Sequence, residues 1–419
     1  MDPYLLLEKT KRLLYDEASK AGRSVLMRKL AGPPLSSGTL GPDDEKIARE
    51  QLKARESWFD PAPVKDYENA FADWNGSAHA FSFMGARVAL SSCVHALGLK
   101  PGDEVIVPGY TCVVVPNAFH YAGVKVIYAD IELETYGLNA SALRAKITPD
   151  TKAVLLHHLY GLVCRDYEEI IAIAHERGLF VIEDCAQATG AKYKGRNVGN
   201  LGDVAIYSTE RSKVFSTVEG GFATCNDPTF AQRLEEYRGM APYPDVFRIE
   251  KELYNVIIDY NVDVSPERWW KGRLVGLALR NKVVVSTVRE EENGVRPRHY
   301  GCRLPAPLAV IGLNQLAKVG RYNQERREVA REWDNWCDKA GYEKPLVVEN
   351  SVPVFLRYPL LVEPEKKKDT LWGYRELGVK LGVWYKSNLH PVTSKVEGCP
   401  YADEAVRRCI NFPTIRERS

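Results

Sequence analysis

Between about residues 103 and 225 the chain repeats one pattern: a short apolar run, a polar or glycine-containing turn, and a stretch with helical spacing. The apolar runs that have the composition of strands buried on both faces are 104–107, 124–128, 153–157 and 179–182. Residues 167–178 carry apolar side chains at helical spacing and end in glycine, which predicts a helix. Because strands alternate with helices, the pattern predicts an α/β fold with a mostly parallel sheet.

Two polar residues, Asp184 and Ser208, each follow an apolar run of this sheet. Ligands of parallel α/β sheets bind at the carboxyl ends of the strands, so we expect both side chains to face one crevice. A further helix over about 86–97 would present unpaired N–H groups at its amino end to a phosphate. Gly85 would allow close approach and Arg87 could add a charged donor, although a glycine before a helix is more often a simple turn.

Lys213 lies in the run 207–213 and is followed by the Glu-Gly-Gly segment 219–221. A lysine and a carboxylate at the ends of buried strands suit pyridoxal phosphate (PLP) chemistry. Lys213 would form a Schiff base with the cofactor aldehyde, and Asp184 would keep the pyridine nitrogen protonated. Either residue alone is equally well explained as a loop lysine or a structural carboxylate. Together, in these contexts, they predict a PLP enzyme.

The whole-chain composition adds mainly exclusions. The chain has 419 residues, 45% of them hydrophobic and 27% charged, with a net charge of +2. The length suggests about two or three structural units, and the near-neutral charge gives no case for nucleic acid. Nine scattered cysteines without paired spacing fit free thiols of the cytoplasm. No uncharged apolar stretch reaches the ~20 residues of a membrane helix, and the first residues lack the features of a secretion signal.

Some residue types invite a metal or nucleophile interpretation that their context does not support. His157 and His158 are adjacent, but no carboxylate or cysteine lies at metal-ligand spacing from them, so we expect no metal. Cys185 follows an apolar strand, which favours packing in the core over a nucleophilic role.

Taken in order, many segments resemble the DegT/DnrJ/EryC1/StrS family of fold-type-I PLP enzymes, best known as sugar aminotransferases. The segments that carry the resemblance include 101–106, 108–111, 158–161, 183–187, 208 with 213, 219–221, 303–304, 312–316 and 357–360. The resemblance covers about residues 41–414, apart from one long insertion. It implies a large PLP-binding domain with a mostly parallel sheet flanked by helices and a smaller C-terminal α+β domain.

The resemblance also implies roles for individual residues. Lys213 would be the Schiff-base lysine and proton shuttle, Asp184 the partner of the pyridine nitrogen, and Gln187 a neighbour of the cofactor's 3-hydroxyl. His158 and Tyr160 would touch the substrate. The full set expected to bind the cofactor is Gly85, Ala86, Arg87, Cys112, Asp184, Gln187, Ser208 and Lys213.

Three positions depart from the family pattern. Ala86 and Arg87 stand where many members have a hydroxyl residue that binds the phosphate, and Arg87 would replace it. Cys112 stands where some members place an aromatic ring over the cofactor, so the stacking residue must come from elsewhere. Tyr300-Gly301-Cys302 stands where an asparagine commonly reaches the partner subunit's cofactor.

The expected organisation is an N-terminal helical extension and linker over 1–41, the large PLP-binding domain over 42–239, an insertion over 240–298 and a small domain over 299–419. The insertion combines aromatic and basic residues: Arg268, Trp269, Trp270, Lys271, Arg273 and Arg280. They would form either a lid or platform for a large anionic acceptor or an ordinary inserted helical subdomain. We favour the subdomain.

By this resemblance, the chain would transfer an amino group from L-glutamate to a keto-sugar, expected to be linked to a nucleotide, in making an amino sugar or natural product. Family members usually form homodimers with composite active sites. A PLP-dependent sugar dehydratase or other lyase is an alternative, but sugar dehydratases of the family replace the lysine by histidine. A keto-cyclitol acceptor and a PLP-binding regulator without turnover also remain open. A plain nucleotide-binding module is disfavoured because no GxGxxG motif follows the first strand.

Overall fold

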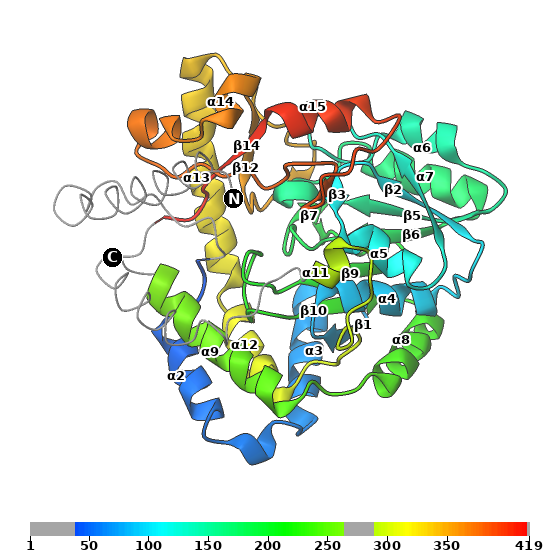
Figure 1. Ribbon diagram of the computed structural model, residues 1–419, viewed down its shortest axis with the longest axis vertical. Coiled ribbons are helices and arrows are strands. Elements are labelled where there is room, and N and C mark those ends of the chain that lie inside the picture. Colours follow the sequence, from blue (N-terminus) through cyan, green and yellow to red (C-terminus); the bar gives the residue numbers. More distant parts are fainter. Residues whose placement is uncertain (1–37, 264–288, 417–419) are drawn as a thin grey trace, which may run out of the picture.

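The computed structural model describes residues 38–263 and 289–416 (Figure 1). Its helices are α2 (Pro42–Gln51), α3 (Ala62–Asn75), α4 (Ala86–Ala96), α5 (Val114–His120), α6 (Ala140–Lys146), α7 (Tyr167–Arg177), α8 (Pro228–Met240), α9 (Val246–Asp263), α11 (Arg289–Glu292), α12 (Ala306–Leu316), α13 (Val319–Ala340), α14 (Pro364–Lys368) and α15 (Pro400–Arg408). Its strands are β1 (His79–Phe83), β2 (Glu104–Pro108), β3 (Thr111–Cys112), β4 (Lys125–Ala129), β5 (Thr151–His157), β6 (Phe180–Asp184), β7 (Lys192–Tyr193), β8 (Arg196–Asn197), β9 (Val204–Ser208), β10 (Gly221–Cys225), β11 (Ser351–Val352), β12 (Tyr358–Leu361), β13 (Leu389–His390) and β14 (Cys409–Phe412).

The central sheet has seven strands in the order β1-β10-β9-β6-β5-β2-β4. The pairs from β9 to β4 are all parallel, and only β10 runs antiparallel to its two neighbours. The four strands expected from the apolar runs are β2, β4, β5 and β6. The mostly parallel α/β fold is therefore confirmed.

Helices cover both faces of this sheet, as Figure 1 shows. Side chains of one strand alternate between the two cores: Val105 and Val107 pack with α4, α5 and α8, whereas Ile106 packs in the core that contains α3, α7 and α12. This two-residue period is the reason that strands buried on both faces read as continuous apolar runs. The expected helices over 86–97 and 167–178 are α4 and α7, and α7 ends at Gly178 in a left-handed conformation with φ 63°.

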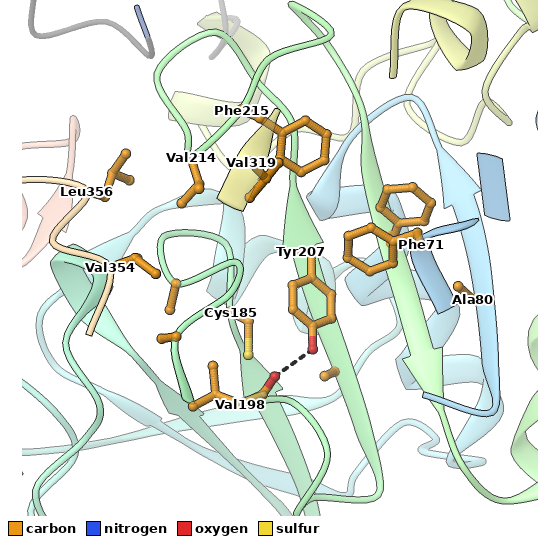
Figure 2. Packing of buried hydrophobic residues seen from close by; sticks show 14 of the residues in the cluster. Phe71, Ala80, Cys185, Val198, Tyr207, Val214, Phe215, Val319, Val354 and Leu356 are labelled. Carbon is orange, nitrogen blue, oxygen red and sulfur yellow. Dashed lines mark hydrogen bonds between the residues drawn. The ribbon is translucent and has the colours of Figure 1, made fainter. Parts of the chain in front are cut away.

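Figure 2 shows the core on the α3 face, around Tyr207 and Cys185, the residue that follows Asp184 in the chain. Tyr207 of β9 is fully buried there and donates a hydrogen bond from its hydroxyl to the carbonyl of Val198 at 2.7 Å. Phe71 of α3 stacks on Phe222 of β10 with ring centroids 4.0 Å apart. Cys185 is completely buried in the same cluster, beside the tyrosine. These contacts hold β6, β9 and β10 in register, and the candidate site lies at their ends.

The C-terminal part builds a third core from α13, α15 and the antiparallel pair β12–β14. It approaches the central sheet through β13, which forms a separate two-stranded parallel pair with β3, so that Leu389 lies opposite Thr111 and His390 opposite Cys112. This pairing brings the segment 384–390 to the carboxyl ends of the central strands. The domain boundaries expected from the sequence stay a prediction.

Part of the segment 240–298 is described. Helix α9 packs against α2, and Ile249, Leu253 and Val256 on its inner face are fully buried in the core. Arg268, Trp269, Trp270, Lys271, Arg273 and Arg280 lie outside the described residues. Over residues 38–263 and 289–416, no helix combines the length and apolar character needed to cross a membrane.

Candidate active site

A pocket of about 170 Å³ lies at the carboxyl ends of β5, β6 and β9. Its wall is built from four parts of the chain: the amino end of α4, the β3–α5 turn, the loop after β9, and the C-terminal segment around β13. The expected residues that line it are Gly85, Ala86, Arg87, Cys112, His158, Asp184, Gln187, Ser208 and Lys213. The structure therefore brings the whole expected cofactor set together, as the topology of a parallel sheet predicts.

Asp184 is the last residue of β6 and lies opposite His157 in the β5–β6 register. Its Oδ1 accepts a hydrogen bond from the backbone N–H of Ala186 at 2.9 Å, which fixes the carboxyl group at the strand end. Burial raises the pKa of Asp184, while the Ala186 N–H and the positive charge of Lys213 act in the opposite direction. The carboxyl group is therefore half-buried at the wall of the pocket, within electrostatic reach of the lysine.

Lys213 sits on the loop between β9 and β10, which folds into its own hydrogen-bonded hairpin. The Lys213 N–H donates to the carbonyl of Glu210 at 2.9 Å, and the hydroxyls of Thr209 and Thr217 lie 2.6 Å apart. These bonds fix the loop, and the side-chain nitrogen of Lys213 then lies 5.0 Å from the centre of the Trp384 ring.

Trp384 and Tyr385 are aromatic residues of the pocket that the sequence interpretation did not assign. Their rings stack with centroids 6.4 Å apart and an interplanar angle of 18°. They supply aromatic surface in the pocket that Cys112 lacks. The signal in the sequence was the adjacent Trp-Tyr pair at 384–385, but nothing local indicates that it returns to a pocket almost two hundred residues away.

Gln187 is held at both ends of its amide group. Its Oε1 accepts from the backbone N–H of Tyr160 at 2.8 Å, and its Nε2 donates to the hydroxyl of Tyr385 at 3.0 Å. The Tyr160 side chain itself is fully buried in the third core, where its hydroxyl lies 3.0 Å from that of Tyr110. It is absent from the described residues that line the pocket. Contact between the Tyr160 side chain and substrate, expected from the resemblance, therefore finds no support in this geometry; its backbone instead orients Gln187.

His158 lines the pocket with a ring whose two nitrogens are already occupied. Nδ1 accepts from the backbone N–H of Cys164 at 3.1 Å, which leaves the proton on Nε2, 3.2 Å from Glu183 Oε2. The groups that also donate to Glu183 are Tyr167 Oη and the backbone N–H groups of Gly199, Leu201 and Gly202. Burial alone would raise the pKa of Glu183, but these hydrogen bonds and His158 bring it below its ordinary value.

This arrangement also bears on metal binding. Ligand atoms of His158, Glu183 and Cys185 lie within 4.8 Å of one another and all three residues are buried. The imidazole and the carboxylate spend their lone pairs on protein hydrogen bonds, and burial holds the pKa of the Cys185 thiol well above its ordinary value. A metal would have to replace these bonds, so the cluster favours a structural role beneath the pocket.

The amino end of α4 closes the opposite side of the pocket. The backbone of β10 passes so close to it that a Cβ on Gly221 would lie 2.5 Å from the amide nitrogen of Ala86. Only glycine allows this approach. The first N–H groups of a helix have no intrahelical acceptor, and the hydroxyl of Ser208 lines the same pocket, so this end suits an anion.

Arg87 and Tyr300 contact parts of the chain that the sequence interpretation did not connect with them. Arg87 forms an ion pair with Glu291 of α11, and both side chains are largely buried. The Tyr300 hydroxyl donates to the Arg87 carbonyl at 2.8 Å and lies 3.1 Å from the Ser91 hydroxyl. The segment that stands in place of the family's asparagine is therefore bonded to α4 of its own chain.

An α/β sheet with a lysine, a carboxylate and a helix amino end converging on one pocket defines a class of enzymes that hold an anionic cofactor at the strand ends. The chain belongs to the DegT/DnrJ/EryC1/StrS aminotransferase family, whose sequence model matches residues 43–262 and 274–418. Family membership expected from the sequence motifs is thus confirmed.

Two named relatives agree with this assignment, and a solved structure agrees with the fold. The chain is 39% identical over 198 residues to a GDP-perosamine synthase of Escherichia coli O157:H7. This aligned segment covers 47% of this chain and only 53% of that protein. It is 40% identical over 354 residues to the UDP-2-acetamido-2-deoxy-3-oxo-D-glucuronate aminotransferase of Pseudomonas aeruginosa, covering 84% of this chain and 85% of the relative. The fold is similar to that of the Streptococcus pneumoniae protein Spr1654 in its PLP form, with a TM-score of 0.68, 20% identity, and coverage of 93% and 94% of the two chains.

Proposed function

We propose that the protein is a PLP-dependent aminotransferase that moves an amino group from L-glutamate to a keto-sugar. The observation that carries the proposal is the convergence of Lys213 and Asp184 on one pocket whose far side is the amino end of α4. A primary amine, a carboxylate and an anion-binding helix end are the three groups that a pyridine aldehyde phosphate needs. Trp384 and Tyr385 add aromatic surface. The residues present therefore fit the cofactor.

Bound in this pocket, PLP would supply an electron sink for the carbanion that transamination requires. The chain's own residues would do the rest. Lys213 would hold the cofactor aldehyde covalently and, once released from it, carry a proton between the two carbons that exchange the amino group. Asp184 would accept a hydrogen bond from the ring nitrogen, and the nearby lysine charge helps to keep the carboxyl ionised. Gln187, fixed by Tyr160 and Tyr385, would orient one edge of the ring.

The acceptor we propose is a keto-sugar carried on a nucleotide. The names of both relatives describe enzymes of nucleotide-linked sugars, and one of the two aligns over most of its length with this chain. We further propose L-glutamate as donor, a homodimer in which the partner completes each site, and a cytoplasmic location. All nine cysteines are free thiols, which supports a reducing compartment.

Absorbance spectroscopy of the purified protein tests the first half of this reaction. Protein loaded with PLP should show the visible band of lysine-bound cofactor, and L-glutamate should convert it to the pyridoxamine form. Lys213→Ala should bind PLP without the lysine-bound band. Binding through Lys213 with no response to glutamate would reject the donor and favour a lyase or a regulator, whereas no binding of PLP would reject the proposal as a whole.

Turnover with candidate acceptors tests the second half. Protein in the pyridoxamine form should return to the lysine-bound form when a nucleotide-linked 3-keto or 4-keto sugar is added. A free keto-cyclitol serves as the competing acceptor. Recovery with the cyclitol alone would contradict the nucleotide-linked acceptor while leaving the aminotransferase assignment intact.

A further inference from the structure

Arg87 stands at the boundary between the candidate active site and a second hollow. Its side chain folds back over the amino end of α4, where Nε lies 3.7 Å from the position that a Cβ on Gly85 would take. The same side chain lines both the pocket that contains Lys213 and a neighbouring hollow of about 390 Å³. The guanidinium is therefore placed to meet an anion on either side.

On the side of the second hollow that anion is already part of the protein. Glu291 of α11 lines this hollow and forms an ion pair with Arg87, with only 1% of the Glu291 side chain exposed and 19% of the Arg87 side chain. Burial alone would lower the pKa of Arg87, but the negative charges of Glu291 and Glu219 raise it. Arg87 therefore keeps its positive charge, which carboxylates of the protein itself neutralise.

The segment that carries Glu291 is fastened to the helices beside the pocket. Asn117 of α5 donates from Nδ2 to the backbone carbonyl of Glu291 at 2.7 Å. The hydroxyl of Tyr121 donates to the Val295 carbonyl at 3.0 Å, and Tyr300 is bonded to the backbone of Arg87. These bonds fix the backbone of the segment that carries Glu291, so little further loss of backbone entropy accompanies its ion pair with Arg87.

We propose that the Glu291 carboxylate competes with the cofactor phosphate for Arg87. This competition lowers the affinity of the amino end of α4 for that phosphate. The inference rests on the proposed function for the identity of the phosphate. A guanidinium that already pairs with a buried carboxylate attracts a second oxyanion less strongly, because its single positive charge is shared between the two. Removing the charge of Glu291 while keeping its shape should therefore free Arg87 for the pocket.

Equilibrium binding of PLP to cofactor-free protein tests the inference without reference to turnover. Glu291→Gln should bind PLP about tenfold more tightly than the natural protein, the change expected when one charge-assisted contact is gained. Glu292→Gln removes the same charge from the exposed neighbour on α11 and should leave the affinity unchanged. In the Arg87→Met background, Glu291→Gln should have no effect, because the group for which the two anions compete is gone.

The opposite results overturn the inference. Weaker or unchanged PLP binding by Glu291→Gln would mean that the carboxylate instead orients Arg87 toward the pocket or plays no part. A gain in PLP affinity that persists in the Arg87→Met background, or that Glu292→Gln also produces, would mean that the net charge near the pocket causes the effect and not competition for Arg87. Calorimetric titration with inorganic phosphate should give the same order of affinities. The phosphate titration separates the inference about Glu291 from the proposed function. A protein that binds phosphate but not PLP contradicts the proposed function alone.

Discussion

The side-chain nitrogen of Lys213 lies 5.0 Å from the centre of the Trp384 ring, and the guanidinium carbon of Arg357 lies 5.2 Å from the centre of the same ring. One indole thus contacts two cations from different parts of the chain. Lys213 comes from the loop after β9, and Trp384 from the segment that leads to β13. Because an indole face attracts cations, Trp384 is a positioning residue for Lys213 whenever that amine is free of the cofactor.

Trp384→Leu should therefore slow the glutamate half-reaction. A cation–π contact contributes about 0.5–2 kcal/mol, which corresponds to a loss of about 2- to 30-fold in rate. Stopped-flow absorbance in a single turnover measures this step directly. Trp384→Phe keeps an aromatic face and should retain most of the rate. Equal losses in the two variants would show that the indole matters for its size and not for its interaction with the amine.

The contrast between Lys213 and Trp384 also shows which parts of the site the sequence could predict. The strands were readable because burial on both faces leaves an uninterrupted apolar run, and Lys213 and Asp184 were readable because chemistry constrains what stands at strand ends. The roles of Trp384 and Glu291 could not be predicted in this way. Trp384 reaches the pocket through the β13–β3 pairing, and Glu291 meets Arg87 across 204 positions of sequence. Such contacts are fixed by tertiary packing, which leaves no local pattern.

Gly221 gives a second prediction, because it links the fold to the anion-binding end of the pocket. A methyl group there would lie 2.5 Å from the Ala86 amide nitrogen and 2.6 Å from the Tyr207 carbonyl oxygen, both of them backbone atoms that cannot rotate away. Gly221→Ala should push α4 away from β10, lower the stability by about 1–3 kcal/mol and weaken PLP binding. Thermal unfolding and PLP titration measure the two effects.

Gly239 provides the matched control for that substitution. It lies in α8, and a Cβ added there would meet nothing within 4 Å. Gly239→Ala should keep PLP affinity and gain up to about 1 kcal/mol of stability, since alanine is favoured over glycine in a helix. Normal PLP binding by Gly221→Ala would contradict the placement of the phosphate at the amino end of α4.

Tyr160→Phe separates the two roles that the sequence and the structure suggest for this residue. The structure places its hydroxyl against Tyr110 in the third core, whereas its backbone N–H, which the substitution leaves in place, holds Gln187. We expect a loss of about 1 kcal/mol in stability from the missing hydrogen bond, with KM for the acceptor unchanged. Steady-state kinetics, with the acceptor that the turnover experiment selects, measures KM. A clear rise in KM would restore the substrate contact implied by the family resemblance.

Glu252 of α9 predicts a pH dependence of stability. Its side chain is 1% exposed, and burial, together with the negative charge of Glu219, raises its pKa from the ordinary 4.5 to about 8. Between these two pH values the folded protein holds a proton at Glu252 that the unfolded chain has lost. Stability from this group is therefore full below pH 4.5, decreases as the pH rises toward 8, and is lost above it.

Glu252→Gln keeps the shape of the side chain and removes the titration. At pH 4, where both proteins bury a neutral group, the variant should match the natural protein within about 1 kcal/mol. At pH 9 the variant should be more stable by on the order of a few kcal/mol, because the natural protein must then bury a carboxylate or hold a proton that the unfolded chain has lost. Urea unfolding at both pH values gives the two differences, and other titrating groups cancel between the variants. Asn255 donates to Glu252 Oε2 at 3.0 Å and can donate equally to the glutamine carbonyl, so that hydrogen bond is preserved. A difference between the variants that does not grow with pH would mean that Glu252 is already ionised at neutral pH, stabilised by the positive charges of Arg248 and Arg211.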